Sequence, residues 1–349
     1  MTNWEKYIID QNLTIRQALT LINDLGDSNC VLFVTDDRRK LLGTITDGDI
    51  RRGLIANAQL EHPVISIANK GFRKIQNGGM DMAFIKKCKE AGVTFLPTVD
   101  AEGIVQNVIR VKDLKTVLPL HAVIMAGGKG ERLLPLTKSV PKPMLKVGEK
   151  PIIEHNIDQL RSYGVQHFHI SINYLGHIIS DYFKDGSEKG VNILYVAEEK
   201  PMGTLGSVSI IDQYHKEDVL IMNSDLLTNI DFEDFYNEFK SQNADMAVAT
   251  IPYHVDLPYA IMELEGSKVT AFKEKPRYTY FANAGIYLVK ASMLKLVPAN
   301  SFYNATDLME LLISEKKKLI NYPILGYWLD IGKPEDFARA QKDISHLHL

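Results

Sequence analysis

The chain has 349 residues, of which 45% are hydrophobic and 24% charged, and its formal net charge is -3. This length exceeds the usual size of one hydrophobic core, so we expect two domains. The balanced charge argues against a nucleic-acid partner, and the lack of an apolar run long enough to span a bilayer argues against a membrane partner.

The N-terminal residues, MTNWEKYIIDQN, do not resemble a signal peptide. The two cysteines, Cys30 and Cys88, have no CxxC spacing and lie in apolar or helical surroundings, as reduced core residues do. We therefore expect a cytoplasmic protein.

The first third of the chain contains two similar stretches. Each has a helical pattern, then two strand patterns, then a short helix that carries an aspartate. In the first stretch, a turn at Asp36 and Asp37 separates the strands, and the short helix begins near Asp47. The segment GTITDGDI, residues 43–50, resembles part of a CBS domain, named after cystathionine β-synthase. The resemblance implies an α+β tandem CBS domain pair, a unit that commonly binds adenine nucleotides.

The expected CBS ligand site involves three residues. By the resemblance, Thr46 and Asp49 contact phosphate and ribose, and Asp113 holds the aspartate position in the second stretch. There Arg110 replaces the threonine, which puts a second site in doubt. A helix start with Thr and Asp is also often only a cap. An adenine nucleotide would make this half a regulator, and dimerisation is an equally simple role, so we expect a homo-oligomer.

Pro119 follows the second stretch, and we place the domain boundary near Leu118, which gives domains 1–118 and 119–349. The next segment, AVIMAGGKGERLLPLTKSVPKPML at residues 122–145, predicts a short buried strand that runs into a glycine-rich loop. Glycines at such a loop let the backbone bend and its amides approach an anion closely. The glycines in question are Gly127, Gly128 and Gly130.

Arg132 and Lys142 follow this loop and could hold a polyphosphate and neutralise a leaving group. The loop is neither a dinucleotide fingerprint nor a Walker loop, because the required acidic residue and the lysine after the last glycine are missing. Instead, GGxGxRLxPLT followed by PKPML resembles the signature of sugar nucleotidyltransferases, also called nucleoside diphosphate sugar pyrophosphorylases. The resemblance implies nucleotide contacts from Ala126, Gly127, Gly128 and Gly130.

The segment MGTLGS, residues 202–207, resembles the second glycine loop of that family, which holds the nucleobase and closes over the sugar. The resemblance implies nucleotide contacts from Gly203 and Thr204 and a sugar-phosphate contact from Gly206. Without its neighbours, the threonine could simply cap the following helix.

Two aspartates follow apolar runs far apart in the chain. In VLIMNSDLL, residues 219–227, Asp225 follows the apolar run, as expected where a buried strand delivers a carboxylate to the C-terminal edge of a sheet, and Asp330 lies in YWLDIG. Either aspartate alone could cap a turn, but their positions in the family imply metal ligands. Because Mg2+ is commonly held by one or two carboxylates plus substrate phosphates, we expect Mg2+ as the cofactor.

FKEKP and NAGIY, at residues 272–276 and 283–287, resemble the sugar and phosphate contacts of the family. The resemblance implies that Glu274 accepts sugar hydroxyls and that Lys275 binds the phosphate of a sugar 1-phosphate. Asn283 and the backbone of Gly285 would fix the sugar ring. A KEK run alone is more often a solvated charged loop.

Together these motifs predict that an oxygen of a sugar 1-phosphate attacks the α-phosphorus of a nucleoside triphosphate and releases pyrophosphate. Arg132, Lys142 and Asp225 would be the catalytic residues. The expected fold is α/β, with a doubly wound, Rossmann-like nucleotidyltransferase domain preceded by the CBS pair.

The combination of both halves resembles bacterial glucosamine 1-phosphate guanylyltransferases of legionaminic acid synthesis, which implies GMP transfer from GTP to glucosamine 1-phosphate. The PKP and NAGIY segments also resemble mannose 1-phosphate guanylyltransferases, and thymidylyl or uridylyl transfer stays open. A different class of function is a non-catalytic nucleotide-sugar sensor. The presence of all five charged residues argues against a sensor: Arg132, Lys142, Asp225, Lys275 and Asp330.

Overall fold

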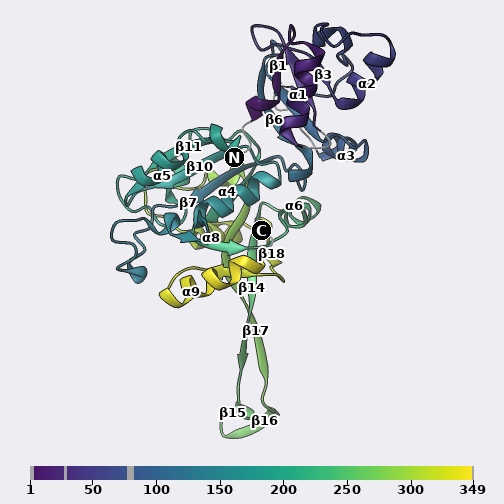
Figure 1. Ribbon diagram of the computed structural model, residues 1–349. Helices are drawn as coiled ribbons and strands as arrows, with labels where there is room; N and C mark the ends of the chain where they lie inside the picture. Colours follow the sequence, from purple (N-terminus) through teal and green to yellow (C-terminus); the bar gives the residue numbers. More distant parts are fainter. Residues whose placement is uncertain (1–3, 27–29, 77–81, 348–349) are drawn as a thin grey trace. The chain divides into compact units, whose positions relative to one another are not determined.

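A computed structural model describes residues 4–26, 30–76 and 82–347 of the chain (Figure 1). Contacts within the chain divide it into two compact units. The first comprises Met1–Leu118 and Ser162–Gly164, and the second comprises Pro119–Arg161 and Val165–Leu349. Among the described residues, no helix is both long and apolar enough to cross a membrane.

The N-terminal unit contains two three-stranded sheets, β1-β2-β3 and β4-β5-β6. In each sheet the first strand is parallel to the second, and the second is antiparallel to the third. A helix precedes each antiparallel pair, α1 in the first sheet and α3 in the second. The elements are β1 (Ile8–Asp10), α1 (Ile15–Leu25), β2 (Leu32–Thr35), β3 (Leu41–Ile45), α2 (Asp47–Ile55), β4 (Ile75–Gln76), α3 (Met82–Glu90), β5 (Phe95–Val99) and β6 (Val105–Arg110).

The ends of the two repeated stretches differ because their capping residues differ. Thr46 and Asp49 form a reciprocal capping box, in which each side chain accepts a hydrogen bond from the other residue's backbone, and α2 follows. After β6, Arg110 offers no such acceptor, and its guanidinium lies 5.4 Å from the ring centre of Phe95. The second stretch therefore ends in a single 3₁₀ turn, Val111–Asp113, where the sequence predicted a short helix.

The second unit is built on one large sheet. Its elements are β7 (Leu120–Met125), β8 (Lys146–Val147), β9 (Lys150–Pro151), α4 (Ile152–Ser162), β10 (His167–Ile172), α5 (Gly176–Phe183), β11 (Asn192–Ala197), β12 (Asp218–Asn223), β13 (Leu226–Thr228), α6 (Phe232–Ser241), β14 (Met246–Asp256), β15 (Ile261–Glu265), β16 (Lys268–Lys273), β17 (Arg277–Lys290), α7 (Ala291–Leu294), α8 (Ala305–Ser314), β18 (Leu319–Pro323), β19 (Trp328–Asp330) and α9 (Pro334–Asp343).

The large sheet has seven strands in the order β11-β10-β7-β12-β17-β14-β18. All neighbours are parallel except β17, which is antiparallel to both β12 and β14. The central strands β7 and β12 are buried along nearly their whole length, as their apolar sequences LHAVIM and DVLIMN require. The α/β fold expected from the sequence is thus present, with a mixed rather than purely parallel sheet.

Four histidines lie together at the edge of this sheet where β7 and β10 begin. The Nδ1 atom of buried His121 accepts a hydrogen bond from the backbone N–H of His215, so its Nε2 carries the proton and donates to Nδ1 of His169 at 2.6 Å. The ring of His167 stacks on that of His215 at 4.2 Å. Burial, followed by repulsion from His169, lowers the pKa of His121 to about 3.

We expect this histidine cluster to make the unit less stable in acid. An unfolded histidine has a pKa of about 6.5. Below that pH, His121 is therefore protonated in the unfolded chain but stays neutral in the folded protein. The stabilisation by neutral His121 is complete above pH 6.5 and is lost, by up to about 1.4 kcal/mol per pH unit, as the pH falls further. Urea unfolding between pH 7.5 and about pH 5 measures this slope.

The variant His121→Gln should flatten that slope, whereas His177→Gln, which changes an exposed histidine on α5, should leave it unchanged. If the free energy of unfolding changes equally with pH in wild type and both variants, buried neutral His121 is not the cause of the acid sensitivity.

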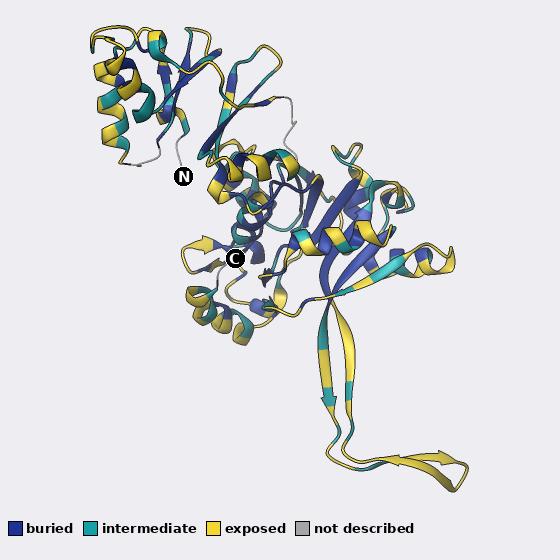
Figure 2. Cartoon of the chain, turned by 90° about the vertical axis from the view of Figure 1, so that its right-hand side faces the viewer, coloured by how far each residue is buried: buried dark blue, intermediate teal, exposed yellow. Residues whose placement is uncertain are grey.

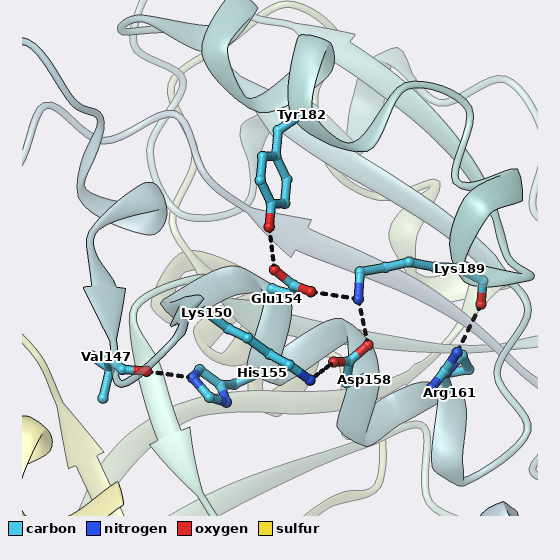
Figure 3. A network of polar contacts seen from close by, with 8 residues as sticks. All are labelled: Val147, Lys150, Glu154, His155, Asp158, Arg161, Tyr182 and Lys189. Atoms are coloured by element: carbon cyan, nitrogen blue, oxygen red, sulfur yellow. Dashed lines mark hydrogen bonds and ion pairs between the residues drawn. The ribbon is translucent and has the colours of Figure 1, made fainter. Parts of the chain in front are cut away.

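A network of charged side chains holds the acidic residues of α4 (Figure 3). Lys189 Nζ lies 2.7 Å from both Glu154 Oε1 and Asp158 Oδ1, and its side chain is only 12% exposed. Lys150 binds the other oxygen of Asp158 at 2.6 Å, and the Tyr182 hydroxyl donates to Glu154 at 2.6 Å. Burial and the Glu154 carboxylate raise the pKa of Tyr182 to about 12. The network therefore fixes the position of α4.

The strands β14 and β17 continue past the rest of the sheet as a two-stranded ribbon, and β15 and β16 form a hairpin beyond it (Figure 1). We call residues 252–281 the arm. Figure 2 shows that the arm is exposed along most of its length, in contrast to the buried sheet from which it extends.

Candidate active site

The glycine loop and Asp225 leave neighbouring strands at the same edge of the sheet. The parallel strands β7 and β12 end in register, with Met125 opposite Asn223. From β7 the chain crosses first to β10 on one side and later returns to β12 on the other. This reversal is the kind of point at which α/β sheets form a crevice beyond the C-terminal strand ends. The backbone N–H of Ser224 donates to Met125 O at 3.1 Å, which joins the two loops at their start.

Two glycines of the first loop are closely packed, and Gly130 is also held in a left-handed conformation. Gly130 has a φ of +64°, and an added Cβ there would lie 2.9 Å from Cβ of Lys142. At Gly127 a Cβ would come within 3.1 Å of the Glu198 carboxylate. At Gly128, in contrast, a Cβ would meet nothing within 4 Å, so the loop is open on that side. The contacts predicted between a nucleotide and Ala126, Gly127, Gly128 and Gly130 remain predictions.

The centre of the site is a lysine between two carboxylates. Lys142, in a 3₁₀ turn at Lys142–Met144, has a side chain only 10% exposed, and its Nζ contacts Asp225 Oδ2 and lies 3.7 Å from Asp330 Oδ1. The pairing of β13 with β19 brings the aspartates together, because Leu226 lies opposite Asp330. The N–H of Ile331 also donates to the Asp225 backbone oxygen at 3.0 Å. Residues distant in sequence therefore meet in one cluster.

The electrostatics of this cluster favour a bound cation. Burial and the neighbouring Asp225 carboxylate raise the pKa of Asp330, although Lys142 and Arg132 act to lower it. The Oδ1 atoms of Asp225 and Asp330 are buried and have no hydrogen-bond partner among the residues that the structure describes. Two hard oxygen ligands in this state fit a divalent cation such as Mg2+. Across the described ranges, no group of three or more His, Cys, Asp or Glu side chains forms a metal cage, so the fit is to a sparse site that substrate phosphates would complete.

Arg132 lies beside the carboxylates. It belongs to a 3₁₀ turn at Glu131–Leu133, and its guanidinium lies against Gly332, where an added Cβ would come 3.2 Å from a guanidinium nitrogen. Gly332 follows Asp330 by two residues, so the arginine adds positive charge next to that carboxylate. The four charged residues predicted from the sequence for catalysis and metal binding, Arg132, Lys142, Asp225 and Asp330, thus occupy one site.

The second glycine loop packs on the start of α8. The Thr204 hydroxyl accepts a hydrogen bond from Ala305 N–H at 2.9 Å, so it caps α8 rather than the turn that follows it in sequence. Gly203 has a φ of +78°, and an added Cβ there would lie 2.7 Å from Tyr303 O. At Gly206 the corresponding distance to Ser301 O is 2.5 Å. Close packing alone therefore requires both glycines, and the nucleotide and sugar contacts predicted for this loop are not tested by it.

Asn283 and Gly285 lie at the same edge as Asp225. Asn283 Oδ1 accepts from Gly285 N–H, and its Nδ2 donates to the Tyr287 hydroxyl, both at 2.9 Å. Gly285 has a φ of +73°, and an added Cβ there would clash with the Asn223 side chain at 2.5 Å. Asn223 ends β12, two residues before Asp225. The structure therefore brings Asn283 and Gly285 to the sheet edge that carries Asp225, and their predicted contacts with a sugar remain predictions.

Glu274 and Lys275 are not brought to the site. Both are exposed and follow β16 within the arm. Both precede β17, which begins at Arg277, and the six residue steps from Arg277 to Asn283 rise about 20 Å, at about 3.3 Å per residue. Within one chain in this conformation, no side chain can bridge that distance.

Glu198 is a site residue that the sequence did not identify. Its carboxylate lies against Gly127, accepts a hydrogen bond from the Ser171 hydroxyl and accepts another from the backbone of Met202 at 3.3 Å. It therefore joins both glycine loops to β10. The signal in the sequence was weak, since it consists only of the pair Glu198 and Glu199 shortly before MGT.

We expect Glu198→Ala to raise the KM for the nucleotide by about tenfold to a hundredfold, with a smaller change in kcat, because both loops lose a common anchor. Steady-state kinetics on the purified variant measure this. Glu199→Ala, which changes the exposed neighbour, is the matched control and should behave like wild type. If the two variants have the same KM, Glu198 does not position the loops.

In the N-terminal unit, Thr46 lines a cavity of about 570 Å³ together with Asp47, Arg51 and Arg73. Asp49 does not line this cavity, and its carboxylate binds Thr46 and the Arg52 guanidinium. Asp113 is also absent from the lining. Of the three residues predicted to bind a ligand here, Thr46 and Asp49 are hydrogen-bonded to each other, and only Thr46 lines the cavity.

Known proteins that resemble this chain match it mainly in the second unit. A family model described as nucleotidyl transferase matches residues 121–346. A mannose-1-phosphate guanyltransferase of Yarrowia lipolytica is 30% identical over 228 residues, which cover 62% of this chain and 62% of that protein. A mannose-1-phosphate guanylyltransferase of Mycobacterium tuberculosis is 30% identical over 231 residues, which cover 64% of each chain. This chain therefore spans less than two thirds of the length of these relatives.

One solved structure, from Bacillus anthracis, is described as a candidate glucose-1-phosphate thymidylyltransferase in complex with sucrose. It superposes with a TM-score of 0.54 at 24% identity and covers 66% of this chain and 97% of its own. At this identity the likeness shows a shared mixed α/β fold.

Proposed function

Because this chain belongs to the nucleotidyl transferase family, we propose that it transfers a nucleoside monophosphate from a nucleoside triphosphate to a sugar 1-phosphate and releases pyrophosphate. The observation that carries the proposal is the cluster of Lys142, Asp225 and Asp330, with Arg132 beside it, at the sheet edge where the glycine loop begins. This arrangement combines a site for a cation with donors for phosphate oxygens.

In the proposed reaction, an ionised oxygen of the sugar 1-phosphate attacks the α-phosphorus. The bond from that phosphorus to the oxygen of the β-phosphate breaks, and pyrophosphate leaves with the electron pair. Such transfers depend mainly on positioning and charge neutralisation, and an ionised nucleophile needs no general base.

Residues of this chain would supply those effects. Lys142 and Arg132, the cations beside the two carboxylates, would donate to the triphosphate as charge builds on the leaving group. Asp225 and Asp330 would hold Mg2+, which as a Lewis acid neutralises phosphate charge. Asn283, held by Gly285 and Tyr287, would orient the sugar.

For specificity, we propose GTP as the donor, on the basis of the PKP and NAGIY segments and of the two guanylyl-transferring relatives. The acceptor we propose is glucosamine 1-phosphate, and the product would then serve nucleotide sugar synthesis for bacterial glycans such as legionaminic acid. Mannose 1-phosphate is the second candidate acceptor, because it is the substrate that the names of both relatives give.

A grid of substrates tests these proposals. Pyrophosphate release is measured with Mg2+ for the common nucleoside triphosphates against glucosamine, N-acetylglucosamine, mannose and glucose 1-phosphates. We expect release with GTP and one sugar phosphate. Turnover with thymidine or uridine triphosphate instead would overturn the choice of base, and no turnover with any pair would support the non-catalytic sensor.

For the N-terminal unit, we propose that the cavity beside Thr46 is a CBS-type site for an adenine nucleotide. Support comes from its two arginines, Arg51 and Arg73, which suit phosphate, and from a volume of about 570 Å³. Calorimetric titration with AMP and ATP tests it, with Arg51→Ala as the variant expected to weaken binding. Heat of binding that is unchanged by Arg51→Ala would place the nucleotide elsewhere.

A further inference from the structure

The arm has one apolar face on its ribbon. In an antiparallel ribbon, residues directly opposite each other lie on the same face, and faces alternate along the strand. Tyr253 lies opposite Tyr280, and Val255 lies opposite Tyr278, two residues further along. These four side chains therefore share one face, and Tyr253 and Tyr280 are 60% and 59% exposed.

The hairpin beyond the ribbon repeats this arrangement. Met262 lies opposite Phe272, and Leu264 lies opposite Val269, so four large apolar side chains share a face. All four are more than half exposed, at 51%, 66%, 63% and 54% respectively. Hydrophobic side chains gathered in this way mark an interaction surface, and a two-stranded hairpin alone is at best marginally stable in water.

The opposite face of the arm is mainly polar, apart from Pro252 and Phe281 where the ribbon begins, and its charged side chains are paired. Arg277 forms a two-pronged ion pair with Asp256 at 2.6 and 3.0 Å. Lys273 binds Glu263 at 3.0 Å. One face therefore satisfies its charges within the arm, while the apolar face has no cover within the described residues of this chain.

The charge of the arm indicates what covers it. The arm has equal numbers of acidic and basic residues. The acidic residues are Asp256, Glu263, Glu265 and Glu274, and the basic residues are Lys268, Lys273, Lys275 and Arg277. A nucleic acid or an anionic lipid surface would require an excess of positive charge. An identical arm, in contrast, offers the same apolar face and balanced charge, and its open strand edges can pair across a two-fold axis.

Two residues of the arm are missing from the site that the chain itself builds. Glu274 and Lys275 resemble sugar and phosphate contacts, yet they are exposed and precede β17, whose rise from Arg277 to Asn283 is about 20 Å. Lys275 also has a φ of +41°, which is uncommon for a residue with a side chain and is found where the surrounding structure imposes it. A site assembled from one chain therefore lacks its predicted ligand for the sugar phosphate.

We propose that two copies of this chain exchange arms, so that each copy covers the apolar face of the other's arm and receives its Lys275 in the sugar-phosphate subsite. The second part of this proposal rests on the proposed function. The first part concerns association alone and stands without it.

The mass of the full-length protein in solution tests the association. We expect an oligomer in light scattering at micromolar concentration and a smaller species for the double variant Leu264→Glu/Phe272→Glu. These side chains are exposed in the single chain, so the change should not disturb its fold. Glu265→Gln, on the polar face of the hairpin, is the matched control. A monomeric wild type, or a double variant of unchanged mass, would overturn the proposal.

Mixed dimers test the exchange of Lys275. Asp225→Asn and Lys275→Ala chains carry different tags, are co-expressed, and are purified as the mixed species. Each variant alone should be inactive. In the mixed dimer one site combines an intact Asp225 with an intact arm from the other chain, so about half of wild-type turnover is expected. If the arm instead serves its own chain, every site carries one defect and the mixed dimer is inactive.

The outcomes separate this proposal from the proposed function. If wild type turns over no substrate pair, the proposed function fails, and the mass measurement still decides whether arms mediate association. If Lys275→Ala alone keeps full turnover, the arm does not complete the site, and the exchange of Lys275 is wrong while the nucleotidyl transfer stands.

Discussion

Asp225→Asn should lower kcat for pyrophosphate release by roughly 10²- to 10³-fold, the size seen when one preorganised electrostatic partner is removed. Asparagine keeps the shape of the side chain but removes the charge that Lys142 contacts and that a divalent cation needs. The buried Oδ1, which has no hydrogen-bond partner within the described part of the chain, would lose the negative charge that makes it a good cation ligand. The measurement is turnover at saturating Mg2+ and substrates, with circular dichroism to confirm the fold.

Asp181→Asn is the control for this variant, because it removes a carboxylate of the same kind from an exposed position on α5. It should leave kcat unchanged. Turnover of Asp225→Asn close to wild type would mean that the carboxylate is not part of the catalytic machinery and would remove the main support for the metal site.

Lys189→Met should destabilise the second unit by about 3 kcal/mol, the scale expected when a buried ion pair loses one partner. Lys189 is the common partner of Glu154 and Asp158, whose side chains are only 10% and 19% exposed. Burial acts to raise the pKa of Asp158, but hydrogen bonds from Lys150 and Lys189 prevail and lower it. Methionine fills similar space but leaves a buried negative charge on Glu154, for which the Tyr182 hydroxyl is the remaining side-chain donor within the described residues.

Urea unfolding of the full-length protein measures this loss. The matched control is Lys184→Met, which removes an exposed lysine paired with Glu188 and should cost much less stability than Lys189→Met. Equal losses for the two lysines would show that the network around α4 contributes no more than a surface ion pair.

The sequence was sufficient to predict the parts of the site that depend on local pattern. The apolar run before the glycine loop forms β7, and the run before Asp225 forms β12, so the two loops meet because their strands are adjacent and parallel. The meeting of Asp225 with Asp330 was predicted only by resemblance. Its physical cause is the pairing of Leu226 with Asp330, which no local pattern specifies.

Other features could not be predicted from local pattern because they depend on long-range packing. Thr204 has the pattern of a cap, but the helix it caps begins at Ala305. Glu198 belongs to the site because Ser171 and Met202 hold its carboxylate against Gly127, a meeting of segments that no local pattern specifies. In the arm, alternating residues such as Tyr253 and Val255 predict a strand with one apolar face, but they do not show whether that face is covered by the same chain.

The central claim is that the α-phosphate of the nucleotide moves to the sugar 1-phosphate, and the fate of that phosphorus tests it most directly. The protein is incubated with Mg2+, a sugar 1-phosphate and GTP labelled at the α-phosphorus, or another triphosphate if the grid selects it. We predict that the label appears in the nucleotide sugar, that pyrophosphate is unlabelled, and that both products require the sugar phosphate. Label that stays in the triphosphate, or that appears as free nucleoside monophosphate whether or not the sugar phosphate is present, would contradict the account.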